Sequence, residues 1–106
     1  MNEPLIRIVK MEFTPEGAEA FPAIFEAASP KIAAFPGCLG VQLLRDHHDP
    51  ARFFTYSRWE SPDDLEKYRY SELFQSTWAR TKPLFRARAE AWSVYAQGPA
   101  LEGQGN

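Results

Sequence analysis

The sequence predicts an α+β domain with one four-stranded antiparallel sheet and helices on one of its faces. Three observations support this class. Four segments are rich in β-branched and aromatic residues, two carry helix-capping signals and apolar residues at helical spacing, and their order is strand, helix, strand, strand, helix, strand. That order is the split βαβ arrangement of ferredoxin-like folds. A chain of 106 residues is expected to form a single domain.

The first predicted strand covers residues 5–13, where β-branched side chains are interspersed with charged ones. Successive side chains of a strand point to opposite faces of the sheet. Both faces of this strand carry apolar residues, so neither is expected to be fully solvated. One face has Leu5, Arg7, Val9, Met11 and Phe13, and the other has Ile6, Ile8, Lys10 and Glu12.

A helix is predicted to follow, because Thr14 can cap its N-terminus and Pro15 suits its first position. Apolar residues then recur at positions 21, 24, 25 and 28, which is the spacing of one helix face. Proline lacks the backbone N–H that a helix interior uses, so Pro22 and Pro30 predict an interruption. We expect a kink or a restart, with a second short helix beginning at residue 29.

The remaining elements are a hairpin, a second helical segment and a last strand. Strands are predicted over residues 39–46 and 52–60, joined by a turn at residues 47–50. Ser61 caps a helix that should reach about Tyr70, and Ser71 restarts it until Lys82 and Pro83 end it. A fourth strand is predicted over residues 87–95. The domain then covers residues 1–95, and residues 96–106, with three Gly and one Pro, are expected to form a mobile tail.

Composition and charge exclude several classes of protein. Apolar residues make up 44% of the chain and aromatic residues 14%, which excludes a disordered polar protein. The balance of 12 basic and 14 acidic residues does not favour nucleic-acid binding. No apolar run approaches the roughly 18 residues of a membrane span, and residues 1–4 show no secretory signal. Cys38 is the single cysteine, so we expect a cytoplasmic protein without disulfides, and without nucleic-acid or membrane partners.

One face of the predicted sheet would remain uncovered by helices. With the strand phases given above, this face carries Ile6, Ile8, Leu44 and Trp92. An apolar patch of this kind is unusual on a monomer and commonly marks a contact between subunits. We therefore expect a homodimer in which the two open sheet faces pack together.

Several short stretches of the sequence resemble the antibiotic biosynthesis monooxygenase (ABM) superfamily of dimeric α+β barrels. The likeness covers about residues 5–95. It is carried by Phe35-Pro36-Gly37-Cys38, Asp49-Pro50, the run from Phe53 to Ser61, Ser71-Glu72-Leu73-Phe74 and Ala91-Trp92-Ser93-Val94. The resemblance implies a ferredoxin-like subunit that pairs with a second copy and has its pocket between the sheet and the helices.

The superfamily includes oxygenases that oxidise polycyclic quinol-type aromatics with molecular oxygen and without a metal or flavin. They carry an asparagine four residues before a tryptophan at the end of the third strand, together with a tyrosine and an arginine from the helical segment. Here Trp59 matches the tryptophan, Thr55 stands at the place of the asparagine, and Tyr68 and Arg80 are the candidate partners. The resemblance thus implies a cofactor-free oxygenase with Trp59, Tyr68 and Arg80 in catalytic roles.

An aromatic-lined pocket with a few polar groups suits this chemistry, because a substrate anion must be stabilised while water is excluded. Aromatic side chains can supply stacking walls, and Tyr56, Tyr68 and Arg80 can donate to a developing oxyanion. The competing interpretation is ordinary packing of aromatic residues at strand and helix spacing. The expected substrate-binding residues are Val9, Thr55, Tyr56, Phe74 and Trp78.

A related group of the superfamily degrades heme and uses an asparagine on the first strand, a tryptophan in the second helical segment and a histidine about ten residues later. In this sequence those places hold Val9, Tyr68 and Trp78. Heme iron needs an axial ligand, and no imidazole stands at Trp78 to provide one. Heme degradation is therefore less favoured, and we expect neither a cofactor nor a metal.

Three further features have competing interpretations. His47 and His48 are neighbours in the predicted turn, so we expect them to point apart into solvent and to chelate a metal poorly. Cys38 has no basic neighbour in the sequence that would activate it and is expected to be a small core residue. The positive charges at positions 80, 82, 86 and 88 either complement a helix C-terminus or contact an acidic substrate.

The sequence therefore leaves three classes of function open. The first is an oxygenase that acts on a small hydrophobic aromatic substrate, as the resemblance implies. The second is a dimeric module of the same fold that binds a small ligand without turnover, which the departures at Val9, Thr55 and Tyr68 favour. The third is a purely structural dimer domain.

Overall fold

The predicted order of strands and helices is present in the computed structural model, which describes residues 3–104. The helical segment that follows the hairpin consists of two helices and a short 3-10 helix, η1. The elements are β1 (Leu5–Glu12), α1 (Pro15–Ala33), β2 (Cys38–Arg45), β3 (Arg52–Trp59), α2 (Pro62–Arg69), α3 (Glu72–Thr81), η1 (Lys82–Leu84) and β4 (Glu90–Val94).

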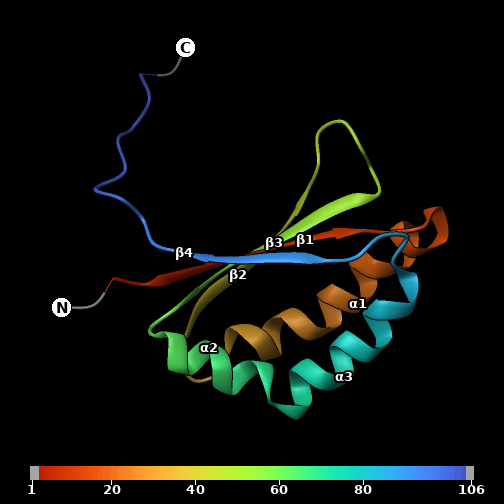
Figure 1. The fold of residues 1–106 in the computed structure, drawn as a ribbon, viewed down its shortest axis with the longest axis horizontal. Helices are drawn as coiled ribbons and strands as arrows, with labels where there is room; N and C mark the ends of the chain where they lie inside the picture. The colour runs from red at the N-terminus through yellow and green to blue at the C-terminus, as the bar shows by residue number, and fades with distance from the viewer. Residues whose placement is uncertain (1–2, 105–106) are drawn as a thin grey trace.

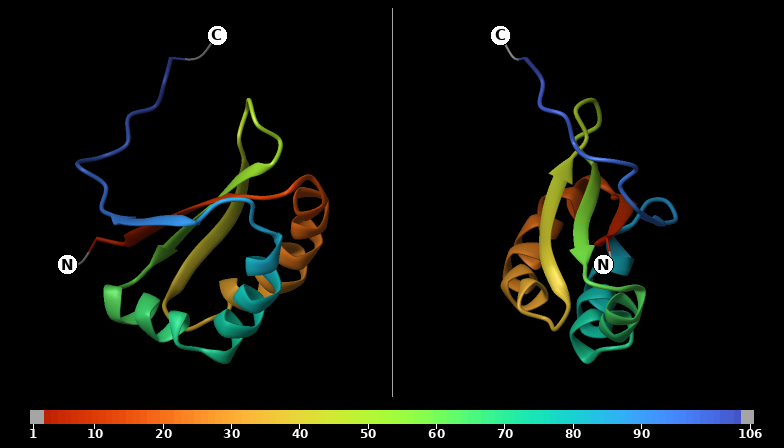
Figure 2. Two further views of the ribbon diagram at one scale, coloured as in Figure 1. Left: turned by 45° about the vertical axis from the view of Figure 1, so that its right-hand side comes forward. Right: turned by 90° about the vertical axis from the view of Figure 1, so that its left-hand side faces the viewer.

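The strands form one antiparallel sheet in the order β2-β3-β1-β4, so β1 has a hydrogen-bonded neighbour on each side. This is the predicted ferredoxin-like arrangement, and the α+β class is confirmed. All three α-helices lie under one face of the sheet, and the opposite face is uncovered (Figure 1). Seen from the end of the molecule, α1 lies on one side beneath the sheet, and α2 and α3 lie on the other (Figure 2).

The start of each α-helix is fixed by a hydroxyl side chain, as the sequence predicts. The hydroxyl oxygen accepts a hydrogen bond from the backbone N–H three residues later, which satisfies one of the free donors of the first turn. The donors are Gly17 for Thr14 at 3.0 Å, Asp64 for Ser61 at 3.1 Å and Phe74 for Ser71 at 3.1 Å. The restart at Ser71 separates α2 from α3 and turns the chain between them.

The predicted interruption of the first helix is wrong, because α1 runs without a break over 19 residues and includes both prolines. Proline at position 30 has no N–H to offer to the carbonyl oxygen of Glu26. The hydroxyl of Ser29 donates to that oxygen instead, at 3.4 Å. The buried side of the helix is continuous across the prolines, with Phe21, Ala28 and Ile32 almost fully covered.

The last strand is shorter than the predicted span of residues 87–95. The chain before it stays at the end of β1, where Phe85 bridges Phe13 and the N–H of Arg86 donates to the carbonyl oxygen of Glu12 at 2.9 Å. Regular pairing with β1 begins only at Glu90. Beyond β4, residues 95–104 are exposed and form neither helix nor strand, and Figure 1 shows them leaving the body of the molecule. Mobility of the segment 96–106 stays a prediction, and residues 105 and 106 lie outside the described part.

The hydrophobic core beneath the sheet is divided into two clusters. One lies at the end of β1 and consists of Met11, Phe13, Phe21 and Phe53, with the ring of Phe13 stacked on that of Phe21 at 4.6 Å. The other lies at the start of β1 and consists of Leu5, Trp59 and Leu65. Residues of both clusters also line a cavity beneath the sheet.

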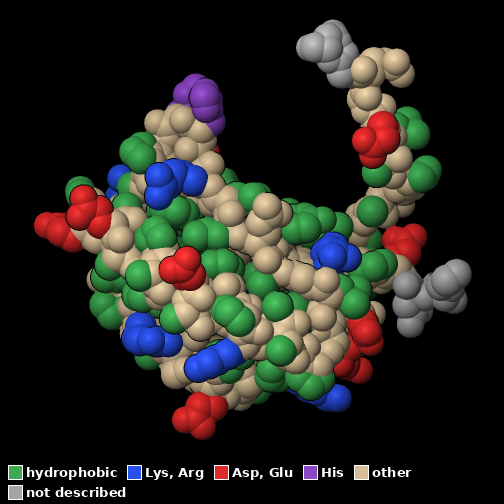
Figure 3. Space-filling model, turned by 180° about the vertical axis from the view of Figure 1, so that it is seen from behind, with side chains coloured by type: hydrophobic (Ala, Val, Ile, Leu, Met, Phe, Trp, Pro, Cys, Tyr) green, Lys and Arg blue, Asp and Glu red, His purple; other side chains and the backbone are tan. Residues whose placement is uncertain are grey.

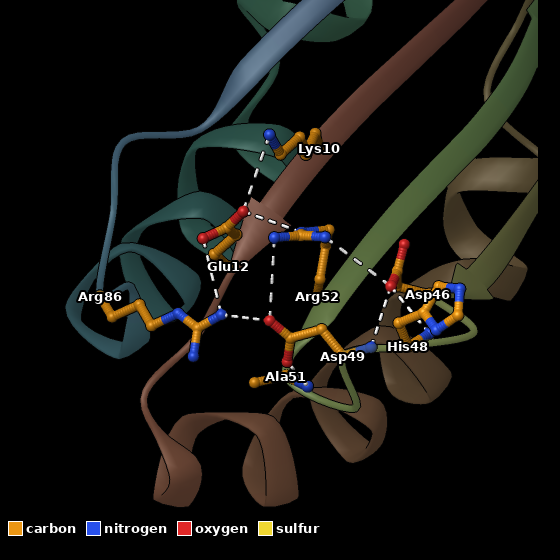
Figure 4. Close-up of polar contacts among 8 residues, drawn as sticks. All are labelled: Lys10, Glu12, Asp46, His48, Asp49, Ala51, Arg52 and Arg86. Atoms are coloured by element: carbon orange, nitrogen blue, oxygen red, sulfur yellow. Dashed lines mark hydrogen bonds and ion pairs between the residues drawn. The ribbon is translucent and has the colours of Figure 1, made fainter.

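A network of charged side chains joins three segments at the end of β1 (Figure 4). Glu12 accepts a hydrogen bond from Nε of Arg52 on β3 at 2.8 Å and lies 3.6 Å from Arg86, which follows η1. Arg86 also donates to Asp49 in the hairpin, and Arg52 lies 3.7 Å from Asp46 and 3.8 Å from Asp49. The network ties the hairpin tip and the chain before β4 to the end of the central strand.

Within residues 3–104, no helix combines the length and the apolar character that a crossing of the membrane requires.

Gly37 provides a test of the turn between α1 and β2. Its φ of +87° lies in the left-handed region, and a Cβ at this position would overlap the side chain of Asp64. We expect Gly37→Ala to lower the free energy of unfolding by roughly 1 to 3 kcal/mol, measured by urea denaturation. Gly103→Ala is the matched control, because a Cβ there meets nothing within 4 Å. Equal urea midpoints for Gly37→Ala and the wild type would contradict this account of the turn.

The charged network predicts a loss of stability in acid. Hydrogen bonds lower the pKa of Glu12 from its ordinary 4.5 and the pKa values of Asp46 and Asp49 from 3.8. The main donors are Arg52 for Glu12 and backbone N–H groups for the two aspartates. Such carboxylates stabilise the fold above their unfolded pKa and lose that contribution as the pH falls through the folded value. We expect the urea midpoint to fall progressively below the ordinary pKa values.

Two variants separate this network from the other acidic groups. Glu12→Gln removes one of the three carboxylates, so its urea midpoint should be lower at neutral pH and should fall less steeply in acid. Glu102→Gln, in the exposed segment after β4, should keep the wild-type pH dependence. The same slope for Glu12→Gln and the wild type would show that the network does not set the acid sensitivity.

Candidate functional site

A cavity of about 300 Å³ lies between the sheet and the helices, in the space that separates the two core clusters. Its sheet side is formed by residues of all four strands, and its other walls are formed by α1, α2 and α3. Binding sites for small molecules span about 300 to 1,000 Å³. The cavity therefore has the volume of a small ligand site.

The structure brings most of the predicted site residues together around this cavity. The strand residues among them share the inner face of the sheet, since β1 and β3 pair Val9 with Thr55 and Leu5 with Trp59. The helix residues fall on one side of the α2–α3 segment. The lining includes Val9, Thr55, Trp59, Tyr68, Phe74 and Trp78.

Two predicted residues, Tyr56 and Arg80, are not among the residues that line the cavity. Tyr56 has the opposite phase from Thr55 and Ser57, so alternation along β3 directs it to the uncovered face of the sheet, where it pairs with Ile8. Arg80 lies on the exposed side of α3. The lining face of that helix is given by positions 74, 77, 78 and 81, the spacing of one helical stripe, and position 80 falls outside it.

Trp59 and Tyr68 form the most tightly held part of the wall. Trp59 is only 1% exposed, and its indole N–H donates to the hydroxyl of Ser57 at 2.9 Å. The ring of Tyr68 stacks on the indole with 5.0 Å between centroids and 28° between planes. Phe74 continues the aromatic wall at 5.3 Å from Tyr68, and Trp78 stacks on Phe74 at 5.7 Å. Flat aromatic surfaces of this kind suit a planar ligand.

The Tyr68 hydroxyl is protonated over the whole neutral range. Burial raises the pKa of Tyr68 to about 12, with a smaller contribution from Cys38. Among residues 3–104 no hydrogen bond to this hydroxyl is made, so its proton is available to a ligand. Burial also raises the pKa of the Cys38 thiol, which packs beside Trp59 as a half-buried residue and is not activated as a nucleophile.

Thr77 carries a buried polar atom without a partner in the described part of the chain. Its Oγ1 meets no hydrogen-bonding group, although the residue lies on the lining face of α3. Unpaired buried polar atoms are rare in native proteins because each loses its hydration without compensation.

Sequence reasoning missed two arginines of the lining, Arg7 on β1 and Arg69 at the end of α2. Arg7 donates a hydrogen bond to Oγ of Ser93 on β4 at 2.9 Å, and Arg69 lies 3.6 Å from Glu66. Burial and the nearby charge of Arg69 lower the pKa of Arg7 from its ordinary value. One signal for Arg7 was present in the sequence, because it is the single charged residue on the apolar face of β1.

The histidine pair lies far from the cavity, at the tip of the β2–β3 hairpin, and is exposed as predicted (Figure 3). The expectation that the two rings point apart is wrong, because their centroids lie 4.7 Å apart in an edge-to-face contact. No group of three or more His, Cys, Asp or Glu side chains within residues 3–104 is placed to hold a metal ion. Charges of both signs are scattered over the face that Figure 3 shows.

Solved structures with the same fold are numerous. A protein of Pseudomonas aeruginosa is 26% identical, with a TM-score of 0.82, and the match covers 92% of this chain and 98% of that one. A candidate antibiotic biosynthesis monooxygenase of Chloroflexus aurantiacus is also 26% identical, with a TM-score of 0.75 and coverage of 94% and 99%. A similar candidate of Nitrosomonas europaea, at 15% identity and a TM-score of 0.86 over 93% and 95%, supports the fold alone.

A search of curated proteins finds no match to this sequence. The model of the antibiotic biosynthesis monooxygenase (ABM) family, in contrast, matches residues 4–80, which include β1, the hairpin and the segment that carries Trp59 and Tyr68. The match covers more than half of the chain and includes most of the segments that line the cavity, although it ends before β4. The chain belongs to the antibiotic biosynthesis monooxygenase family.

Proposed function

We propose that the protein is a cofactor-independent monooxygenase that oxidises a small hydrophobic aromatic substrate of quinol or anthrone type with molecular oxygen. One observation is the main support for this proposal. The aromatic cavity presents the protonated Tyr68 hydroxyl, which has no hydrogen-bond partner among the described residues, next to the stacked face of Trp59. Family membership supports the reaction class, and the aromatic lining of the cavity supports a hydrophobic aromatic substrate.

Two requirements of this chemistry, stabilisation of the substrate anion and exclusion of water, have counterparts in the site. The substrate must lose a proton, its anion must be stabilised, and water must be kept out while the anion reacts with oxygen. The Tyr68 hydroxyl can donate a hydrogen bond to the oxygen on which negative charge develops. The rings of Phe74 and Trp78 can pack against a planar substrate and exclude water, and Trp59 supports the wall behind Tyr68. Val9 and Thr55 close the sheet side of the pocket.

The electrons for the reaction come from the substrate. With anthrone as the probe, the methylene carbon loses two hydrogens and gains a carbonyl oxygen from dioxygen, and the second oxygen atom leaves as water with those two hydrogens. The products are anthraquinone and water. This balance requires no reductant besides anthrone.

We further propose that the protein is a homodimer. The uncovered face of the sheet carries Ile6, Ile8 and Tyr56 at its centre, according to the pairing of β1 with β3. Trp92 on β4 and Leu44 on β2 flank them and remain 45% and 41% exposed. A contiguous apolar patch on a sheet face favours packing against a second copy. In such a dimer Tyr56 serves the subunit contact and not the cavity.

Tyr68→Phe tests the catalytic proposal, because it removes the hydroxyl and keeps the ring. We expect kcat/KM for anthrone to fall by about 100-fold or more, which is typical when a donor to a developing oxyanion is lost. The measurement is oxygen uptake together with anthraquinone formation, corrected for the reaction without protein. Because the pKa of Tyr68 is raised to about 12, the loss should be the same across the neutral pH range.

Tyr70→Phe is the matched control, since Tyr70 lies two residues away and is 76% exposed. It should keep the wild-type rate, and so should Arg80→Met, which changes a residue outside the cavity. If the wild type binds anthrone without consuming oxygen, the protein is the non-catalytic ligand-binding module instead. If Tyr68→Phe and the wild type consume oxygen equally fast, Tyr68 has no catalytic role.

Ile8→Glu tests the dimer, because it places a charge at the centre of the uncovered sheet face. We expect light scattering to give the mass of two chains for the wild type and of one chain for this variant, with the circular dichroism spectrum unchanged. Ala79→Glu introduces the same charge on the exposed side of α3 and should remain a dimer. A wild-type protein that stays monomeric at high concentration would refute the proposed assembly.

A further inference from the structure

We propose that the ligand of the cavity is an aromatic acid, whose carboxylate is bound by Arg7 while its ring lies among the aromatic residues of α2 and α3. This inference deepens the proposed function, since it rests on the cavity being the ligand site and names the class of compound that the site selects. It assigns a binding role to Arg7.

The inner face of the sheet changes from polar to apolar along β1. Arg7 lies directly opposite Ser57 on β3 and opposite Ser93 on β4, so the three side chains form a polar row across the sheet. Two residues further along, Val9 lies opposite Thr55 and Ala91, and beyond them Met11 lies opposite Phe53. A ligand that spans these rows needs one polar end and one apolar end.

The positive charge of Arg7 is not neutralised by the protein. Within residues 3–104, no carboxylate oxygen lies within 4.0 Å of its guanidinium. The acid whose charge acts on Arg7 is Glu66, and this residue already lies 3.6 Å from Arg69. Glu90 on β4 also lines the cavity, but it pairs with Lys10, three positions along β1 from Arg7, and makes no ion pair with Arg7. The described lining therefore holds two guanidinium groups and one carboxylate.

Arg7 is held in place but keeps free donors. Its Nη1 donates to Oγ of Ser93 at 2.9 Å, which fixes the planar guanidinium against β4. A guanidinium has five N–H donors in a rigid fork, and the fork matches the two oxygens of a carboxylate. Burial and the nearby charge of Arg69 both disfavour the charged form of Arg7 and lower its pKa. A bound anion removes this disadvantage and so gains affinity.

The test compares 1-naphthoate with 1-naphthamide, two compounds with the same rings and with a charged or a neutral head group. Isothermal titration calorimetry on the full chain should show that the wild type binds 1-naphthoate at least about tenfold more tightly than 1-naphthamide, as expected for a hydrogen bond to a charged group. Arg7→Met should weaken binding of 1-naphthoate by about ten- to a hundredfold and leave that of 1-naphthamide within about twofold.

Two further variants complete the experiment. Arg80→Met removes the same charge outside the cavity and should bind both compounds as the wild type does. Arg7→Lys keeps the charge but loses the fork, so its loss of affinity for 1-naphthoate should be smaller than that of Arg7→Met. Binding of 1-naphthamide shows that each variant is folded. If Arg7→Met does not fold, Arg7→Lys and the wild-type comparison decide the question.

Three results would overturn the inference. They are equal affinity of the wild type for the two compounds, no effect of either substitution at Arg7, or an equal loss with Arg80→Met. Absence of binding for both compounds would overturn it as well. The proposed oxygenase activity is judged separately by oxygen uptake with anthrone, which is uncharged, so either proposal can fail while the other stands.

Discussion

The division of the core into two clusters is the constraint on which the rest of the structure depends. Protein interiors are usually packed to leave few voids larger than a water molecule, so a cavity of about 300 Å³ needs supports that prevent its collapse. The Phe13–Phe21–Phe53 cluster joins α1 to one end of the sheet, and the Leu5–Trp59–Leu65 cluster joins α2 to the other. Between these supports α3 packs against α1 and leaves the inner face of β1 open to the cavity.

The side chains of the central strand β1 alternate between the two faces of the sheet, so this strand contributes to both the cavity and the uncovered face. Its odd-numbered residues contact the interior and the cavity, and its even-numbered residues Ile6 and Ile8 lie on the uncovered face. A shift of one residue in the pairing would exchange these two sets, so the register of β1 must be strongly fixed. The charged network at Glu12 contributes to this, because Arg52 and Arg86 approach it from opposite sides of the strand's end. Fold, cavity and proposed subunit contact are thus properties of one short segment.

Much of the fold, and part of the cavity lining, could be predicted from local sequence signals. Caps at Thr14, Ser61 and Ser71 fixed the helix starts, and the phase of the first strand placed Val9 on the face opposite Ile6 and Ile8. Pro30 misled because the compensating hydrogen bond from Ser29 to Glu26 is visible only in three dimensions. Tyr56 and Arg80 were selected for their chemistry, whereas strand phase and helix spacing decide which side chains reach the cavity. The contact of Arg7 with Ser93 joins residues 86 positions apart, which local patterns do not reveal.

The three tryptophans occupy three different environments, and this gives the protein an intrinsic set of optical reporters. Trp59 is sealed beneath Tyr68 in the cavity wall, Trp78 lines the same cavity while half-buried, and Trp92 stands on the outer face with 45% of its surface exposed. Indole emission shifts to the blue when water leaves its surroundings. The emission of Trp78 therefore responds to binding of a ligand in the cavity, and the emission of Trp92 responds to association of two chains. Variants that retain only one of these tryptophans can follow each event separately.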